Sequence, residues 1–166
     1  MTFKVVNCMP IPGVDWGDNL LEPLDATLIK GMWMTEDEII GNSKGADAVL
    51  GATSAQPFSR RVLEALSPQC RIIASAGVGY ELIDVDAATE LGMVVCNVPD
   101  YGLDEVSGLA VTMILALGHK ILQVDKAVRE RQINALKDRK ALVEVCYPMF
   151  RMRNQTVGII GVGRIG

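Results

Sequence analysis

The sequence lacks the excess of basic residues that would attract nucleic acid or anionic lipid. It has 16 Lys and Arg against 20 Asp and Glu, a formal charge of -4, whereas phosphate backbones and acidic membranes recruit clustered basic side chains. Its longest apolar run, Leu109 to Gly118, is about half of the roughly 20 residues that span a bilayer. The amino terminus shows no leader pattern. We therefore expect no nucleic-acid partner, no membrane partner and a cytoplasmic location.

Paired metal-binding and redox residues are also missing. The four cysteines, Cys8, Cys70, Cys96 and Cys146, form no Cys-x-x-Cys pair, so we expect reduced thiols and no metal site. The single histidine, His119, lies inside a helical stretch, where a structural or solvent-facing role is favoured over a catalytic one.

The remaining composition is that of a folded protein. Hydrophobic residues make up 49% and charged residues 22% of the 166 residues, which argues against wholesale disorder. Five short apolar runs are bounded by Gly, Pro, Asn or Asp, and we interpret them as buried strands. Because these runs alternate with helical segments, they predict an α/β fold with a parallel sheet. The runs are Lys4–Val6, Ala26–Ile29, Ala48–Leu50, Arg71–Ala74 and Met93–Val98.

Three helices are expected between these strands. Thr35 followed by Glu38 forms a capping box, which predicts a helix from about residue 36 to residue 40. Residues 59–66 place apolar side chains on one face, and residues 85–91 end at Gly92, a common residue after a helix.

The second half of the chain has a different pattern. From Leu103 to about Ile133, apolar residues recur every three or four positions, which predicts one long amphipathic helix. Its length would be roughly 45 Å, so we expect it to bridge two domains or two subunits. Asn134 to Asn154 is interpreted as a loop with one short helix, and Thr156 to Ile160 as a new strand.

A Gly-x-Gly-x-x-Gly motif follows this last expected strand. Gly161 would permit a tight turn, Gly163 would let a pyrophosphate approach the backbone, and Gly166 would allow close helix packing. Alone, the motif fits an ordinary strand-to-helix turn as well as a dinucleotide site, and the preceding strand favours the second. The acidic residue that binds the ribose, expected about 20 positions later, would fall after the last residue.

A second glycine pair, Gly77-Val78-Gly79, directly follows the expected strand Arg71–Ala74. Unhindered amides at the carboxyl end of a parallel strand can bind a small carboxylate. The alternative is a plain turn that needs positive backbone dihedrals. Taken by themselves, these residues favour the plain turn.

Together the two glycine motifs resemble a known family. Arg71–Asp84, with its Ala-Gly-Val-Gly-Tyr, and Gly92–Pro99 resemble the D-isomer-specific 2-hydroxyacid dehydrogenases. Gly161–Gly166 falls where that family keeps its nucleotide turn, and the resemblance runs from about Asp47 to the end. Cys96–Gly102 is most similar to the branch that contains the C-terminal-binding-protein corepressors.

The resemblance implies a flavodoxin-like substrate domain over residues 1–101. Residues 102–166 would then hold a long connecting helix and the first strand and turn of an incomplete Rossmann domain that binds NAD, with NADP not excluded. The family transfers a hydride between the nicotinamide and C2 of a small 2-hydroxy or 2-oxo acid. Its catalytic arginine, glutamate and histidine lie beyond the nucleotide turn, so the resemblance implies a truncated, inactive chain with no catalytic residue.

The resemblance also assigns binding residues. In this family the amides of the Gly-Val-Gly turn hold the substrate carboxylate in an interdomain cleft. Ala52 and Thr53 stand where phosphoglycerate-specific relatives carry a basic residue, which favours an unphosphorylated acid. A packing tyrosine and a core valine remain alternatives for Tyr101 and Val106. The expected substrate-binding residues are Gly77, Val78, Gly79 and Tyr101, and the expected cofactor-binding residues are Val106, Gly161, Gly163, Arg164, Ile165 and Gly166.

Two departures from the family pattern carry expectations of their own. Glu81 replaces the usual aspartate after the glycine turn, and we expect it to keep an acidic role at a helix start. Gly108 lies inside the long helix, where glycine costs about 1 kcal/mol relative to alanine.

Two functions remain open from the sequence. The first is a fragment of an NAD-dependent dehydrogenase that acts as a homodimer. The second is a non-enzymatic protein, either a dinucleotide-responsive corepressor relative or a module that dimerises through the apolar stripe of its long helix.

Overall fold

The computed structural model describes residues 2–11, 13, 18–51, 55–131, 134 and 137–166. The chain divides into two compact units, Met1–Tyr101 and Gly102–Gly166.

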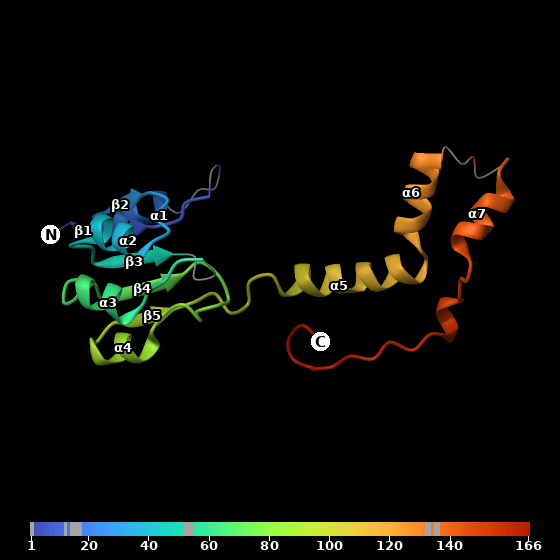
Figure 1. Cartoon of the computed structure of the whole chain (residues 1–166). Coiled ribbons are helices and arrows are strands. Elements are labelled where there is room, and N and C mark those ends of the chain that lie inside the picture. The colour runs from blue at the N-terminus through green and yellow to red at the C-terminus, as the bar shows by residue number, and fades with distance from the viewer. Residues whose placement is uncertain (1, 12, 14–17, 52–54, 132–133, 135–136) are drawn as a thin grey trace. The chain divides into compact units, whose positions relative to one another are not determined.

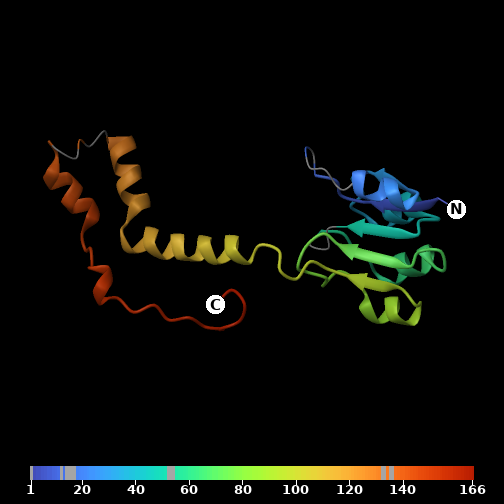
Figure 2. The same ribbon diagram turned by 180° about the vertical axis from the view of Figure 1, so that it is seen from behind.

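The first unit is built on one sheet of five strands that all run parallel (Figures 1 and 2). The strand order is β2-β1-β3-β4-β5, the flavodoxin-like order in which ligands bind outside the carboxyl ends of the strands. All five expected strands are confirmed, with ends shifted by one or two residues. They are β1 (Phe3–Asn7), β2 (Ala26–Lys30), β3 (Ala48–Gly51), β4 (Ile72–Ser75) and β5 (Val94–Cys96).

The three expected helices of this unit are also confirmed. They are α2 (Glu36–Ser43), α3 (Arg60–Leu66) and α4 (Val85–Glu90). One further short helix, α1 (Asp18–Leu21), and a 3-10 turn, η1 (Glu22–Leu24), lie before β2. Neither was expected, because a single turn is too short to show a helical period in the sequence.

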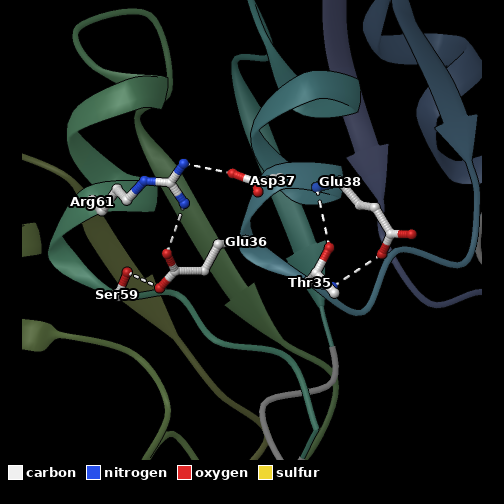
Figure 3. Close-up of polar contacts among 6 residues, drawn as sticks. All are labelled: Thr35, Glu36, Asp37, Glu38, Ser59 and Arg61. Atoms are coloured by element: carbon white, nitrogen blue, oxygen red, sulfur yellow. Dashed lines mark hydrogen bonds and ion pairs between the residues drawn. The ribbon is translucent and has the colours of Figure 1, made fainter.

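The start of α2 shows the predicted capping box (Figure 3). The N–H of Glu38 donates to the Thr35 hydroxyl at 3.4 Å, and the N–H of Thr35 donates to Glu38 Oε2 at 3.0 Å. Next to it, Arg61 on α3 contacts Glu36 at 2.9 Å and also Asp37. These polar contacts fix the start of α2 against α3.

One face of the sheet carries the core. Val6, Val49 and Ile73 lie side by side in register and are fully buried. On the other face, Ile72 and Val94 pair in register and remain 42% and 56% exposed. Because α2, α3 and α4 all contribute to the core cluster, they cover the first face. Their buried residues are Ile39, Val62, Leu63, Leu66, Ala87 and Ala88.

The second unit corrects the expectation of one long helix. The stretch forms two helices, α5 (Leu103–Gly118) and α6 (Ile121–Arg131), with a bend of 63° between them. Lys120 in the break has a φ of 53°, and a left-handed residue cannot continue a right-handed helix. The expected end at Ile133 lies outside the described residues.

The segment after α6 holds a second correction. A short helix, α7 (Arg139–Cys146), is confirmed, and a 3-10 turn, η2 (Met152–Asn154), follows it. Thr156 to Ile160, expected as a strand, has no strand structure. A strand is defined by hydrogen bonds to a neighbouring strand, and the described part of the second unit contains none.

The helix α5 is strongly apolar yet unpacked. All of its 16 residues are described, and none is buried. Among the described helices, none has by itself both the length and the apolar character needed to cross a membrane, and α5 with α6 meets that standard only as a bent pair.

Candidate functional site

The loop that follows β4 presents its backbone in an unusual way. Each of three successive carbonyl oxygens accepts a hydrogen bond from the protein. The N–H of Val98 donates to Gly77 O at 2.9 Å, the Asn97 side-chain amide to Val78 O at 2.8 Å, and the Ser75 hydroxyl to Gly79 O at 2.7 Å. The carbonyl side of the loop is therefore tied to the protein.

The amide side of this loop differs from the carbonyl side. Within the described part of the chain, no acceptor is bonded to the N–H of Gly77, Val78 or Tyr80. Neighbouring N–H groups of this kind, at the carboxyl end of a parallel strand, can bind an anion. The geometry thus fits a small carboxylate.

The glycines of the loop are not explained by backbone conformation. Neither Gly77 nor Gly79 is among the described residues with a left-handed φ, so the alternative of a turn that needs positive dihedrals is wrong. A Cβ added at Gly77 would meet no atom within 4 Å. Neither strain nor packing inside the chain requires glycine at Gly77, and the open space is available to a ligand.

One acidic group lies next to the loop. A Cβ added at Gly79 would lie 2.5 Å from Glu81 Oε2, so the Glu81 carboxylate lies against that glycine. The expected role of Glu81 at a helix start is wrong, because Asp84 caps α4 by accepting from the N–H of Ala87 at 2.8 Å. Glu81 lies in the turn before this cap, which places it nearer to the loop.

Tyr101 lies in the segment that follows β5. Its N–H donates to Val98 O at 3.4 Å, and its side chain is 70% exposed. Tyr101 is therefore not a buried packing residue within the first unit. Val98 also donates its N–H to Gly77 O. Tyr101 and the loop after β4 are therefore both bonded to Val98.

The expected cofactor residues all lie in the second unit. Val106 is exposed on the first turn of α5, which begins after Gly102 with a φ of 76°. Gly161 has a left-handed φ of 91°, and a Cβ added at Gly166 would collide with the Gly161 carbonyl oxygen. A Cβ at Gly163 would meet no atom within 4 Å. Arg164 and Ile165 lie within this turn and are exposed.

Some residues have no assigned role in the site. All four cysteines are free, and burial raises the pKa of the Cys8 and Cys70 thiols. His119 is exposed and ends α5. In the described residues, no three His, Cys, Asp or Glu side chains gather as a metal site would require.

Sequence reasoning missed the residues that hold the loop. Ser75 ends β4 and Asn97 directly follows β5, and the carboxyl ends of these two strands are neighbours in the sheet. A polar residue at the end of each strand was the available signal. This signal points to one site only when the strand order shows that the two strand ends are neighbours.

Comparisons with known proteins bear on the family of this chain. The family model for the D-isomer specific 2-hydroxyacid dehydrogenase catalytic domain matches residues 23–145. A hydroxypyruvate reductase from Blautia hydrogenotrophica is 30% identical over 164 residues, which are 96% of this chain and 48% of that protein. A D-3-phosphoglycerate dehydrogenase from Methanocaldococcus jannaschii is 34% identical over 133 residues, which are 80% of this chain and 23% of that protein.

Solved structures show the same similarity in three dimensions. The apo D-lactate dehydrogenase from Escherichia coli has a TM-score of 0.68 at 25% identity, covering 99% of this chain and 49% of that one. The apo D-mandelate dehydrogenase from Rhodotorula graminis shares the fold, with a TM-score of 0.77 at 19% identity over 99% of this chain and 50% of that one. The chain spans about half the length of these relatives, or less. Because the family model matches well over half of its residues, the chain belongs to the D-isomer specific 2-hydroxyacid dehydrogenases.

Proposed function

We propose that this chain supplies the acid-binding part, and the start of the nucleotide-binding part, of an NAD-dependent dehydrogenase. The reaction would transfer a hydride between the nicotinamide and C2 of a small 2-hydroxy or 2-oxo acid. One observation carries the proposal. The loop Gly77–Gly79 has its carbonyl oxygens bonded to the protein, and an open space lies next to Gly77.

The first unit would bind and orient the acid. The substrate carboxylate would accept hydrogen bonds from the amides of the loop, which fixes the position of C2. Hydrogen bonds between backbone N–H groups and an anion are stronger than those to neutral acceptors. Tyr101, exposed in the adjoining segment, would contact the rest of the acid.

The second unit would begin the nucleotide site. The left-handed Gly161 and the close approach of Gly166 to its carbonyl fit a turn that wraps around a pyrophosphate, with Val106, Gly163, Arg164 and Ile165 as further contacts. When bound, NAD accepts or supplies the hydride. Charge supports this assignment, since residues 102–166 hold 10 of the 16 Lys and Arg but 6 of the 20 Asp and Glu. NADP could bind to the same turn through its pyrophosphate.

The substrate would carry no phosphate. Residues 1–101 hold 14 of the 20 Asp and Glu but 6 of the 16 Lys and Arg, and this acidic balance disfavours a second anionic group. The sequence argument from Ala52 and Thr53 falls outside the described residues. Similarity to proteins named hydroxypyruvate reductase and glyoxylate reductase makes hydroxypyruvate and glyoxylate the first acids to test.

The remaining proposals concern assembly. We propose a cytoplasmic homodimer without nucleic-acid or membrane partners, in which α5 is covered by a second copy. The supporting observation is that none of its 16 residues is buried. A non-enzymatic dimerisation module, or a corepressor relative as the Cys96–Gly102 similarity suggests, is the second candidate. Sedimentation of the parent protein tests the dimer, and a monomeric parent would contradict it. Leu109 is exposed on α5, and the variant Leu109→Asp should sediment as a monomer.

The enzymatic proposal is tested with the natural gene product. We expect oxidation of NADH with glyoxylate or hydroxypyruvate, and no turnover by residues 1–166 alone. Gly77→Ala should raise the KM for the acid at least about tenfold, since its methyl group enters the space of the carboxylate, a loss of about 1.4 kcal/mol.

Gly41→Ala is the matched control for this variant. Gly41 also has no atom within 4 Å of an added Cβ and has no left-handed φ, but it lies on α2 away from the loop. Its KM should equal that of the parent. Absence of turnover with both acids, in a folded full-length protein that binds NADH, would refute the proposed reaction.

A further inference from the structure

We propose that the second unit carries a binding site for a small monophosphate ester with a flat apolar body. The site is a pocket between the end of α5 and η2, with a volume of about 390 Å³, which is typical of small-molecule sites. Neither the loop Gly77–Gly79 nor the turn Gly161–Gly166 lines it, so the inference does not rest on the proposed function. The lining residues are His119, Met149, Phe150, Arg151, Met152 and Arg153.

The packing of Met152 forms the pocket. A Cβ added at Gly118, the last residue of α5, would collide with Met152 Sδ, so the thioether occupies the space that a side chain at position 118 would need. The N–H of Gln155 donates to Met152 O at 2.9 Å and closes the turn. Because Arg151 and Arg153 flank Met152 in the chain, this contact holds both arginines at the pocket.

Positive charge without an acidic partner distinguishes this pocket. In the described part of the chain, Arg151 and Arg153 form no ion pair, and no Asp or Glu lines the pocket. Residues 145–166 contain three arginines but no Asp or Glu. By contrast, Arg129 on α6 pairs with Asp125 at 2.8 Å. The carboxyl end of α5 adds only about half an elementary negative charge, so the two guanidinium groups leave the pocket positive.

Two guanidinium groups at one pocket fit a dianion. Each guanidinium offers parallel N–H donors that can bind two oxygen atoms of one phosphate. A phosphate monoester carries a charge of about −1.5 to −2 at pH 7, which balances two arginines, whereas a carboxylate carries a single charge. His119, at the edge of the pocket, offers a further ring N–H. The charge therefore favours a monophosphate over a carboxylate.

The rest of the lining is apolar and indicates the body of the ligand. Met149 and Phe150 line the pocket beside the arginines and are 49% and 63% exposed. Aromatic rings pack favourably on one another, and thioether sulfur makes favourable contacts with aromatic rings. These side chains therefore favour an ester with a flat ring over inorganic phosphate.

The test titrates the 166-residue chain with phenyl phosphate in a calorimeter. Benzoate offers the same ring with a single negative charge, and inorganic phosphate offers the charge without the ring. We expect one site for phenyl phosphate. Benzoate should bind about tenfold more weakly, and inorganic phosphate about fivefold more weakly.

Three variants test the lining. Arg151→Gln and Arg153→Gln should each weaken binding of phenyl phosphate at least about tenfold, because each removes charge-assisted hydrogen bonds. Phe150→Ala should weaken phenyl phosphate about fivefold but leave inorganic phosphate unchanged, since it removes only the ring contact. All three side chains are exposed, so the melting temperature should not change.

Arg139→Gln is the matched control. Arg139 is exposed at the start of α7 and does not line the pocket. Its replacement removes the same charge from the same unit and should leave the affinity unchanged. Nitrogen-15 NMR then locates the ligand, because the signals of His119 and of residues 149–153 should shift while those of residues 161–166 should not.

Three results would overturn the inference. If Arg139→Gln weakens binding as much as Arg151→Gln, the chain attracts anions in general and has no site here. If the shifts fall on residues 161–166, the phosphate binds the glycine turn instead. If the parent binds benzoate as tightly as phenyl phosphate, the pocket does not select a phosphate. None of these results affects the acid-binding loop Gly77–Gly79, which is tested with glyoxylate and hydroxypyruvate.

Discussion

The backbone N–H of Val98 donates to the carbonyl oxygen of Gly77 over 2.9 Å, which joins the segment after β5 to the loop after β4. The two valines of this region make a natural comparison. The side chains of Val78 and Val98 are 47% and 49% exposed, yet only the N–H of Val98 has an acceptor among the described residues. The two valines are thus equally exposed, but their backbone N–H groups differ in hydrogen bonding.

This pair gives the first prediction. The amide hydrogen of Val98 should exchange with solvent much more slowly than that of Val78, because exchange requires the hydrogen bond to open. Native-state exchange followed by NMR measures both. Equal rates would show that the amide of Val78 is not presented to solvent.

The second prediction concerns the two faces of the sheet. Ile73→Ala should cost roughly 2–5 kcal/mol of unfolding free energy, because its side chain is fully buried. Ile72→Ala, one residue away on the same strand, should cost well under half of that, since Ile72 is 42% exposed on the other face. Urea unfolding followed by tryptophan fluorescence measures both. A similar loss for the two variants would contradict the assignment of the core face.

A third prediction uses two glycines at the start of the second unit. Gly108→Ala should stabilise α5 by about 1 kcal/mol, because Gly108 is helical and an added methyl group meets nothing. Gly102→Ala has the same free space but a φ of 76°, so it should destabilise by about 1 kcal/mol. Thermal unfolding followed by circular dichroism at 222 nm gives the signs, and shifts of the same sign would be inconsistent with this geometry.

A fourth prediction concerns acid. Hydrogen bonds from the backbone N–H groups of Thr35 and Met34 lower the pKa of Glu38 in the folded chain. A lowered pKa in the folded state stabilises the fold at pH values above the ordinary glutamate pKa of about 4.3. This stabilisation is lost as the pH falls through the pKa of the folded state. Glu38→Gln removes the titration, so its stability deficit should shrink as the pH falls from about 7 to about 3. A deficit that does not vary with pH over that range would rule out this role.

Much of the first unit could be predicted because its signals are local. Runs rich in Val and Ile mark the strands, and Thr35 with Glu38 marks the start of α2. The break between α5 and α6 could not be predicted in the same way, because the apolar period continues on both sides of Gly118. What ends the helix is the backbone of Lys120, with its φ of 53°, and the sequence pattern carries no sign of it.

In the site, too, the features that are local in the sequence could be predicted and those that depend on the sheet could not. The loop with Gly77 and Gly79 could be located, because a glycine pair after a strand is visible in the sequence, but the residues alone favoured a plain turn and only the family resemblance pointed to acid binding. The role of Asn97 depends on β5 lying beside β4, which is a property of the sheet and not of the residues near Asn97. Thr156 to Ile160 has the composition of a strand, but strand structure also needs a partner.

The most direct test of the account is a crystal structure of the full-length protein with NAD and a bound 2-oxo acid such as glyoxylate. We predict a carboxylate oxygen about 2.9 Å from the backbone nitrogen of Val78, with the Asn97 amide still on the Val78 oxygen. An acid bound elsewhere, with only water on the amides of the loop Gly77–Gly79, would contradict it.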